Sequence, residues 1–298
     1  MEFTERKDVH KVLDSSEGMH EVHKGILEKE LDGLSNYIPC SNKSSEISIP
    51  KQNMLTRPNF AFACYYCDGG SSECCVGYMG VCSEKQIQHN IEVAQYGWCS
   101  DPDCLCYQFL YGQIDMHQLE KLYRDGNFVC CESQMLKEWA ACTAYALDSD
   151  QVGEAERKHN DPQSRLAVLT TIKPGTTEED RIVFAVFLAD TNKETENVTE
   201  GYLKANSEYR IKLSLTEATQ IKFWNYCNGG NGNEKCEWSG SWSRCISDIE
   251  AAQILRDITA VKCDPAEKTL AEELLVHFCN TKKIRLNELP APNGVLKR

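Results

Sequence analysis

Cysteine is the residue type in this sequence whose number and spacing best suit a chemical role. The chain has 17 cysteines in 298 residues, and eight of them lie between Cys64 and Cys106. Cys64 and Cys67 are two residues apart, and such a pair can bind one metal ion when a tight turn points both sulfurs inward. Glycine permits the backbone angles of such a turn. Because the segment also holds Gly69, Gly70, Gly77 and Gly80, we expect a structural metal here.

The cysteine segment offers enough thiols for two metal sites with four ligands each. Four thiolates in a tetrahedron form a structural zinc site. The first predicted ligand set is Cys64, Cys67, Cys75 and Cys82, and the second is Cys99, Cys104 and Cys106, with His89 as a further candidate. Zinc is the cofactor we expect, and an iron–sulfur cluster bound to the same thiolates stays open as the alternative. Buried thiols and redox disulfides are the other uses that this spacing allows.

A second group of residues surrounds the loop of Gly and Asn at residues 228–233. Phe223 and Trp224 precede the loop, and Trp238, Trp242 and Arg244 follow it. Stacking of a nucleobase on an aromatic ring is worth about 1–3 kcal/mol, and an arginine beside it adds a cation–π contribution. Trp238, Trp242 and Arg244 are therefore the candidate ligand-binding residues. The alternative is that these aromatic side chains pack into the core, which is their commoner use.

Known catalytic patterns are absent from the sequence. It contains no Gly-rich phosphate loop, no Gly-x-Ser-x-Gly elbow, no His-Glu-x-x-His and no zinc-deaminase pattern. The acidic run from Glu178 to Asp180 precedes a predicted strand, as nuclease metal ligands can do, but no Glu-x-Lys follows in that strand. Whether the protein is an enzyme is therefore open. A nuclease or an iron–sulfur redox protein is kept as the alternative to a binding protein.

Charge and hydropathy restrict the classes of partner. The formal net charge is −13 at pH 7, which opposes the phosphate contacts on which nucleic-acid binding depends. A nucleic-acid partner would therefore need a local basic groove around Arg244. The alternative is an acidic interaction subunit that binds a basic protein.

The absence of targeting patterns sets the expected compartment. No apolar run reaches 18 residues, and the charged N-terminus lacks the apolar core of a signal peptide. We therefore expect a cytoplasmic protein without a membrane partner. Clustered cysteines in a reducing compartment bind metal more often than they form disulfides.

The spacing of apolar residues predicts an α+β protein. Residues 1–38 are expected to form an amphipathic helix, and residues 39–148 a cysteine-rich, mostly helical metal-binding domain. Residues 149–164 are polar and form the predicted linker to a small mixed α+β domain at residues 165–298. That domain starts with strands and ends with three helices. The expected strands are at 166–169, 182–188 and 209–213, and the second is apolar throughout, as in a buried central strand.

Several predicted helices begin with a residue that can cap them. The caps are Ser83 with Gln86, Asp115, Ser214 with Glu217, Ser247 with Glu250, and Asp264 before Pro265. A further helix is predicted at residues 133–147. These capping residues give the expected first turn of each helix.

The order of three strands and a helix, together with the aromatic loop, resembles PUA-like modules that read nucleic acids. The resemblance covers about 100 residues and is one of fold. It implies that the aromatic loop contacts a nucleic acid or a modified base. The expected function is a cytoplasmic, zinc-stabilised binding protein with Trp238, Trp242 and Arg244 at its ligand.

Overall fold

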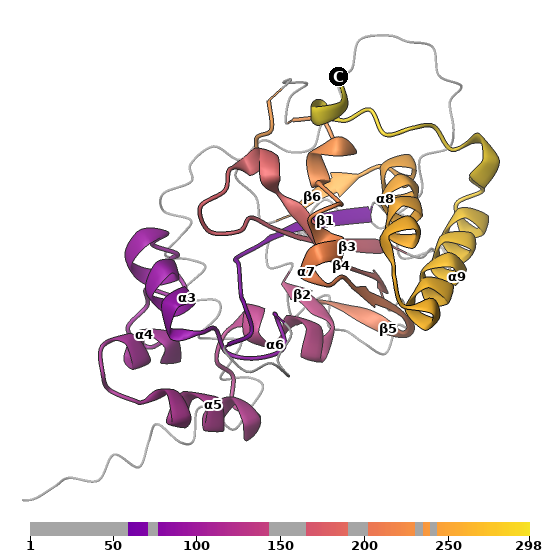
Figure 1. The fold of residues 1–298 in the computed structure, drawn as a ribbon. Helices are drawn as coiled ribbons and strands as arrows, with labels where there is room; N and C mark the ends of the chain where they lie inside the picture. Colours follow the sequence, from indigo (N-terminus) through magenta and orange to yellow (C-terminus); the bar gives the residue numbers. More distant parts are fainter. Residues whose placement is uncertain (1–58, 71–76, 143–164, 190–201, 230–234, 239–242) are drawn as a thin grey trace, which may run out of the picture. The chain divides into compact units, whose positions relative to one another are not determined.

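The computed structural model describes residues 59–70, 77–142, 165–189, 202–229, 235–238 and 243–298 (Figure 1). The chain divides into two compact units. Unit 1 comprises residues 1–56 and 83–130, and unit 2 comprises residues 57–82 and 131–298. The predicted helix at residues 1–38 and the predicted linker at residues 149–164 lie outside the described residues.

Unit 2 is built on a six-stranded mixed sheet that curls into a half-barrel, which confirms the α+β fold class (Figure 1). The strand order is β2-β5-β4-β3-β1-β6. β1 runs parallel to β3, and the other neighbours are antiparallel. The strands are β1 (Asn59–Cys64), β2 (Ala140–Cys142), β3 (Leu166–Thr171), β4 (Ile182–Ala189), β5 (Tyr202–Lys212) and β6 (Ser243–Ile246). The sheet therefore contains strands from both sides of residues 149–164: β1 and β2 precede this segment, and β3 to β6 follow it.

The centre of the sheet carries the core of unit 2. All eight residues of β4 are buried, as are all six of β3, which lies beside it. A strand covered on both faces reads as a continuous apolar run rather than an alternating one. The predicted central position of residues 182–188 is therefore confirmed.

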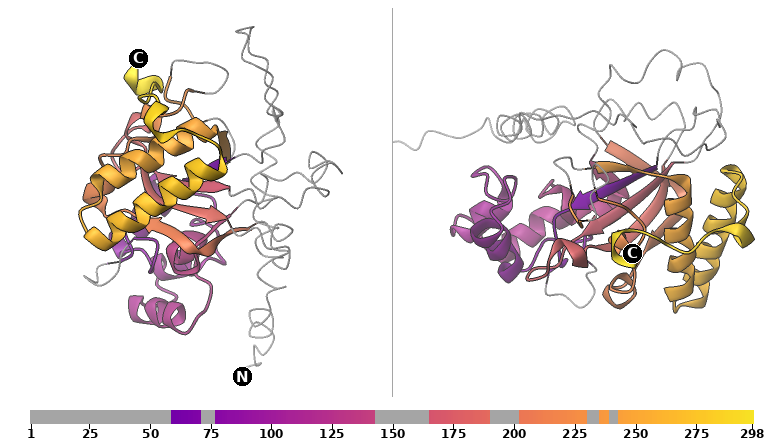
Figure 2. Two further views of the ribbon diagram at one scale, coloured as in Figure 1. Left: turned by 90° about the vertical axis from the view of Figure 1, so that its right-hand side faces the viewer. Right: turned by 90° about the horizontal axis from the view of Figure 1, so that it is seen from above.

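Two long helices of unit 2 lie side by side at the C-terminal end of the chain, as Figure 2 shows. α8 (Asp248–Val261) begins at Ser247 and α9 (Pro265–Thr281) begins at Asp264, and both caps accept backbone N–H groups as predicted. The short α7 (Leu215–Ala218) starts with the predicted capping box of Ser214 and Glu217. In the described parts of the connections the chain forms the 3-10 turns η3 (Glu178–Asp180), η5 (Phe223–Asn225), η7 (Leu286–Glu288) and η8 (Val295–Lys297).

The helix predicted at residues 133–147 is wrong at residues 139–142, and residues 143–147 lie outside the described residues. α6 (Cys131–Glu138) starts there, but Trp139 has a φ of 49°, which a right-handed helix cannot continue. Residues 140–142 then pair with β5 as the edge strand β2. Trp139 packs edge-on against Phe187 in the centre of the sheet at a centroid distance of 6.4 Å. The packing of this ring thus outweighs the helical periodicity of the segment.

The described part of unit 1, residues 83–130, is helical. α3 (Glu84–Gln88) starts at Ser83, which caps Gln86 as predicted, and continues as the π-helix η1 (His89–Val93). α4 (Leu105–Leu110) and α5 (Met116–Arg124) follow. Asp115 forms a full capping box with Gln118 at the start of α5.

Candidate functional site

Buried cysteines gather in unit 1. Its described part contains four of them, Cys99, Cys104, Cys106 and Cys130, and all four are buried. Cys104 occupies the N-cap position of α4 and Cys106 lies in its first turn. The thiols of Cys104 and Cys130 lie close enough to that of Cys106 to change its pKa. The structure therefore joins two residues of the second predicted ligand set to Cys130, which the sequence assigns to packing.

The contacts among these thiols change their acidity in opposite directions. The hydrogen bonds to Cys104 and Cys130, together with burial, raise the pKa of Cys106 well above its ordinary value. The hydrogen bond from Cys106 lowers the pKa of Cys104, and this effect outweighs burial. Of the pair, Cys104 therefore loses its proton before Cys106.

The first predicted ligand set lies in unit 2, at the end of β1 and in the loops after it. Cys64, Cys67 and Cys82 are buried, and Cys75 lies outside the described residues. The Cys67 thiol donates to the Gly80 carbonyl at 3.5 Å, and the Cys64 thiol donates to the Phe62 carbonyl at 3.9 Å. These two thiols therefore have backbone acceptors.

The glycines of this loop have the backbone roles that the sequence predicts. Gly69 and Gly70 have φ values of 73° and 90°, which favour glycine. A Cβ at Gly77 would lie 2.6 Å from the Cys67 carbonyl oxygen, so the backbone here approaches too closely for any side chain. The tight turn after Cys67 is confirmed. Among the described residues, however, no group of three or more His, Cys, Asp or Glu side chains forms a ready metal site.

Tyrosine side chains accompany the unit 2 cysteines. Burial, followed by the nearby Cys64, raises the pKa of the fully enclosed Tyr78 well above its ordinary value. Its ring stacks on Phe184 with centroids 3.9 Å apart. Burial and the neighbouring Asp68 likewise raise the pKa of Tyr66. Both tyrosines therefore stay neutral and act as packing groups here.

The aromatic side chains around η5 form a second candidate site, the aromatic–arginine cluster, which consists of Phe223, Trp224, Trp238, Arg181 and Arg244. Phe223 and Trp224 are fully buried, so the core-packing alternative holds for these two. The half-buried Trp238 lies 5.3 Å from the Phe223 ring and 6.3 Å from the Trp224 ring. The guanidinium of Arg181 lies 4.6 Å from the centre of Trp238, and that of Arg244 lies 5.1 Å from the centre of Trp224.

One arginine of this cluster is fully engaged with a carboxylate. Arg181 donates to both oxygens of Glu178, at 2.5 and 2.9 Å, and the Trp224 indole donates to Glu178 at 3.1 Å. Asp180 forms an ion pair with Lys222 at 2.8 Å. By sequence, the acidic run from Glu178 to Asp180 could have been a nuclease metal site. In the structure, Glu178 instead pairs with Arg181 and accepts from Trp224, and Asp180 pairs with Lys222. Because these cations are paired, they do not add up to the basic groove that a nucleic-acid partner would need.

The other arginine is only partly engaged. Arg244 donates through Nη2 to the Asn228 carbonyl at 2.7 Å. Its Nη1 and the Asn228 side-chain oxygen Oδ1 are both buried and have no hydrogen-bond partner. Each such atom is an exception to the rule that buried polar atoms are paired. The structure brings the predicted Trp238 and Arg244 together, and the predicted Trp242 lies outside the described residues.

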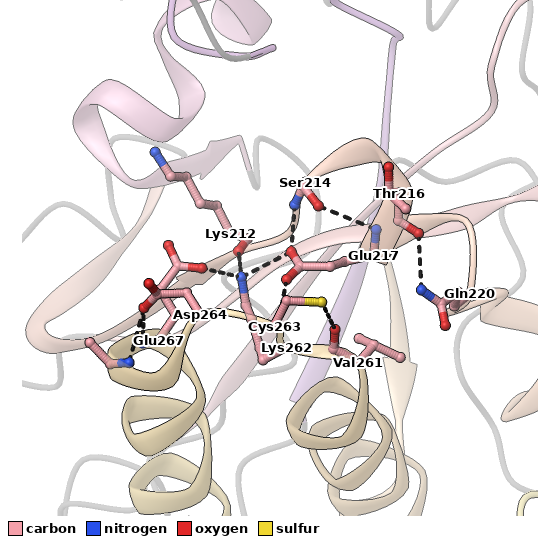
Figure 3. Close-up of polar contacts among 11 residues, drawn as sticks. Lys212, Ser214, Thr216, Glu217, Gln220, Val261, Lys262, Cys263, Asp264 and Glu267 are labelled. Carbon is pink, nitrogen blue, oxygen red and sulfur yellow. Dashed lines mark hydrogen bonds and ion pairs between the residues drawn. The ribbon is translucent and has the colours of Figure 1, made fainter.

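A third polar group, drawn in Figure 3, has no open position. The ammonium of Lys262 contacts Glu217 at 3.1 Å and Glu267 at 2.7 Å, and it donates to the Lys212 carbonyl at 2.6 Å. Burial of Glu217 raises its pKa, but hydrogen bonds from Ser214 and Lys262 outweigh this and leave the pKa below its ordinary value of 4.5. Every donor of the ammonium has an acceptor. This network fixes the corner between β5, α7 and the α8–α9 junction and is structural.

Comparison with protein-family models, with curated proteins and with solved structures finds no match to this chain. Within the described residues, no helix is both long and apolar enough to span a bilayer. The aromatic–arginine cluster and the buried cysteines are therefore the features of the chain that bear on its function.

Proposed function

We propose that this protein binds a nucleobase of a single-stranded nucleic acid through the aromatic–arginine cluster, and that zinc stabilises its fold. The observation that carries the binding proposal is the pair of buried atoms without partners, the donor Arg244 Nη1 and the acceptor Asn228 Oδ1. Leaving one such atom unpaired costs about 1–3 kcal/mol. A ligand that offers both an acceptor and a donor would recover that free energy.

Nucleobases have the matching chemistry. Their hydrogen-bonding edges present acceptors and donors side by side, and their faces stack on aromatic or guanidinium groups. Trp238 is half-buried, unlike the enclosed Phe223 and Trp224, so it is the ring of the cluster with surface left to offer. In this proposal Arg244 and Asn228 read the edge of the base, and Trp238 provides the stacking surface.

The charge of the chain favours base recognition over phosphate recognition. With a net charge of −13, and with Arg181 and Lys222 already paired, few cations remain in the cluster to neutralise phosphates. Phosphate contacts produce a steep loss of affinity with salt, whereas base contacts do not. The proposal therefore predicts a shallow salt dependence.

Fluorescence anisotropy with short single-stranded RNA and DNA probes of mixed sequence tests this proposal. Arg244→Met keeps much of the packing but removes the donors, and we expect binding to weaken about tenfold or more, the loss of one charged hydrogen bond. The matched control is Arg285→Met, which removes the same charge from an exposed pair with Glu288. Thermal unfolding of each variant shows whether the fold is kept.

Two results would overturn the proposal. One is the absence of saturable binding to either probe, and the other is equal weakening by Arg244→Met and Arg285→Met. Equal weakening would mean that charge alone attracts the nucleic acid. The metal-dependent enzyme and the acidic interaction subunit remain predictions, since no observation among the described residues favours either.

A further inference from the structure

We propose that the C-terminal strap, residues 289–298, is a positioning element that holds Asn228 in place to read the edge of a base. This proposal rests on the nucleobase site proposed above and extends it to a segment that lies outside the ligand contacts. The strap belongs to unit 2 and follows the turn η7 (Figure 1). It makes hydrogen bonds to α8 on one side and to the residues of η5 and just after it on the other.

The strap fixes the backbone just before Asn228. The Gly294 N–H donates to the Asn225 carbonyl at 2.8 Å, and the Val295 N–H donates to the Cys227 carbonyl at 3.1 Å. A Cβ at Gly294 would lie 2.7 Å from the Cys227 nitrogen, which is closer than any ordinary contact of a Cβ atom. Glycine, which has no Cβ, lets the two backbones approach this closely. The strap is therefore bound directly to the residue that precedes Asn228.

Two further elements hold the same segment from other sides. The Tyr226 hydroxyl donates to the Asp257 carboxylate of α8 at 2.8 Å. Arg244 of β6 donates to the Asn228 backbone carbonyl at 2.7 Å. Together with the strap, these contacts restrict every residue from 225 to 228. Support of this kind keeps the polar atoms of a binding site in one geometry.

The unpaired atoms of the site depend on this support. Arg244 Nη1 and Asn228 Oδ1 are both buried without a hydrogen-bond partner, although the same two residues are already joined through Nη2 and the backbone carbonyl. Leaving such atoms unpaired costs free energy, so a mobile segment would shift until they found partners. A backbone that is fixed on three sides does not shift in this way. The fold thus keeps the donor and the acceptor ready for a base.

The strap is held by contacts that can open while the sheet stays folded. Gln253 of α8 donates to the Pro290 and Ala291 carbonyls, both at 3.2 Å. Arg256 donates to the Pro290 carbonyl, also at 3.2 Å. Residues 289–293 are all half-buried or exposed, and segments with few buried contacts open at a low free energy. Closure of the strap and binding of a base are therefore linked, and each favours the other by the same factor.

Fluorescence anisotropy with the same single-stranded RNA and DNA probes tests this link through a residue outside the ligand contacts. Gly294→Ala forces the strap away from the Cys227 backbone, and we expect the probe to bind about fivefold more weakly or worse, as for other coupled sites. The matched control is Lys262→Ala, which destabilises unit 2 at the corner between β5 and α8–α9 and should leave the affinity of the folded chain unchanged. Equal weakening by the two substitutions would overturn the positioning role.

A double variant shows whether the strap acts through Asn228. Asn228→Ala should weaken binding, and adding Gly294→Ala should weaken it no further, because the acceptor that the strap positions is already gone. Additive losses would contradict the proposal. Weakening by Arg244→Met without any effect of Gly294→Ala would overturn the positioning role alone, whereas a parent chain that binds neither probe would overturn the nucleobase site as well.

Hydrogen exchange of the unsubstituted chain provides a readout that does not depend on how any variant folds. A saturating concentration of the probe should slow exchange at the amides of Gly294 and Val295. The amide of Leu213, which donates to the Phe184 carbonyl at 2.8 Å elsewhere in unit 2, should exchange at the same rate with and without the probe. Equal slowing at all three amides, or no slowing in the strap, would overturn the proposal.

Discussion

Unit 1 and unit 2 use buried cysteine in different ways. In unit 2 the core is an aliphatic and aromatic sheet, and the Cys64 and Cys67 thiols donate to backbone carbonyls. Half of the buried apolar residues among residues 83–130 of unit 1 are cysteines, and two of them, Cys104 and Cys130, lie beside Cys106. Buried cysteine thus has backbone acceptors in unit 2 and other thiols as neighbours in unit 1. The density of cysteine along the sequence does not separate these two environments, because they depend on contacts that the fold creates.

The largest loss of stability that we predict for one substitution comes from a buried ion pair, and an exposed ion pair serves as the comparison. Lys262→Ala in unit 2 leaves Glu217, whose side chain is 8% exposed, without its cation, and should lower the free energy of unfolding by about 3–5 kcal/mol. The matched substitution in unit 1, Lys121→Ala, removes an exposed pair with Asp125 and should cost less than about 0.5 kcal/mol. Urea denaturation of both variants measures the difference.

A double variant shows whether the unpaired carboxylate causes this loss. In Lys262→Met with Glu217→Gln no buried charge is left unpaired, because Glu267, the other partner of Lys262, is 46% exposed, so much of the stability should return. Because the pKa of Glu217 is lowered in the folded state, its contribution is present above pH 4.5 and is lost as the pH falls further. Equal stability of Lys262→Ala and the double variant would show that lost packing, not charge, is responsible.

A close backbone contact in unit 2 offers the next test. Gly294 N–H donates to the Asn225 carbonyl at 2.8 Å, and a Cβ at Gly294 would lie 2.5 Å from the Trp224 carbonyl oxygen. Gly294→Ala should therefore cost about 1–3 kcal/mol. It should also speed hydrogen exchange at the amide of Val295, which donates a hydrogen bond to the Cys227 carbonyl. Gly112→Ala in unit 1 has open space around it and should leave that amide protected.

The smallest of these effects depends on pH. Glu132 is partly exposed as a residue, but its carboxyl is enclosed, and burial raises its pKa from 4.5 to about 7. A raised pKa in a folded acid gives stability that is complete below pH 4.5 and is lost as the pH rises to about 7. Glu132→Gln should therefore be more stable than the parent by about 1–2 kcal/mol at pH 8 and equal to it at pH 4. A variant that is less stable at pH 8 would contradict this.

Local signals in the sequence predict the elements whose causes are local. The caps at Ser83, Asp115, Ser214 and Ser247 each place a helix start, because a side-chain oxygen and a nearby N–H suffice to make the contact. The continuous apolar run of β4 also predicts that this strand is buried. β6 is four residues long and is formed by pairing with β1, about 180 residues earlier in the chain, so no local pattern indicates it.

The residues of the candidate sites likewise divide into those that a local sequence pattern indicates and those that only the fold brings together. Trp238 and Arg244 stand out beside the Gly and Asn loop, but Arg181 and Glu178 join them only through the sheet, since η3 and η5 come together there. Cys130 lies 24 residues after Cys106 beside apolar neighbours, and its sequence context is that of a core residue. Only the fold of unit 1 brings it to Cys106. Composition therefore singles out the cysteines as a group, and the fold was needed to show which of them lie together.

Hydrogen–deuterium exchange of the full chain, with and without a zinc chelator, tests most directly whether the two units are stabilised differently. If zinc stabilises unit 1, its removal should abolish protection of the amides in α3, α4 and α5, because the aliphatic core of residues 83–130 is small. The amides of β3 and β4, which depend on the aliphatic core of the sheet, should keep theirs. Protection in α4 that survives the chelator, or that is lost together with protection in β4, would contradict this account.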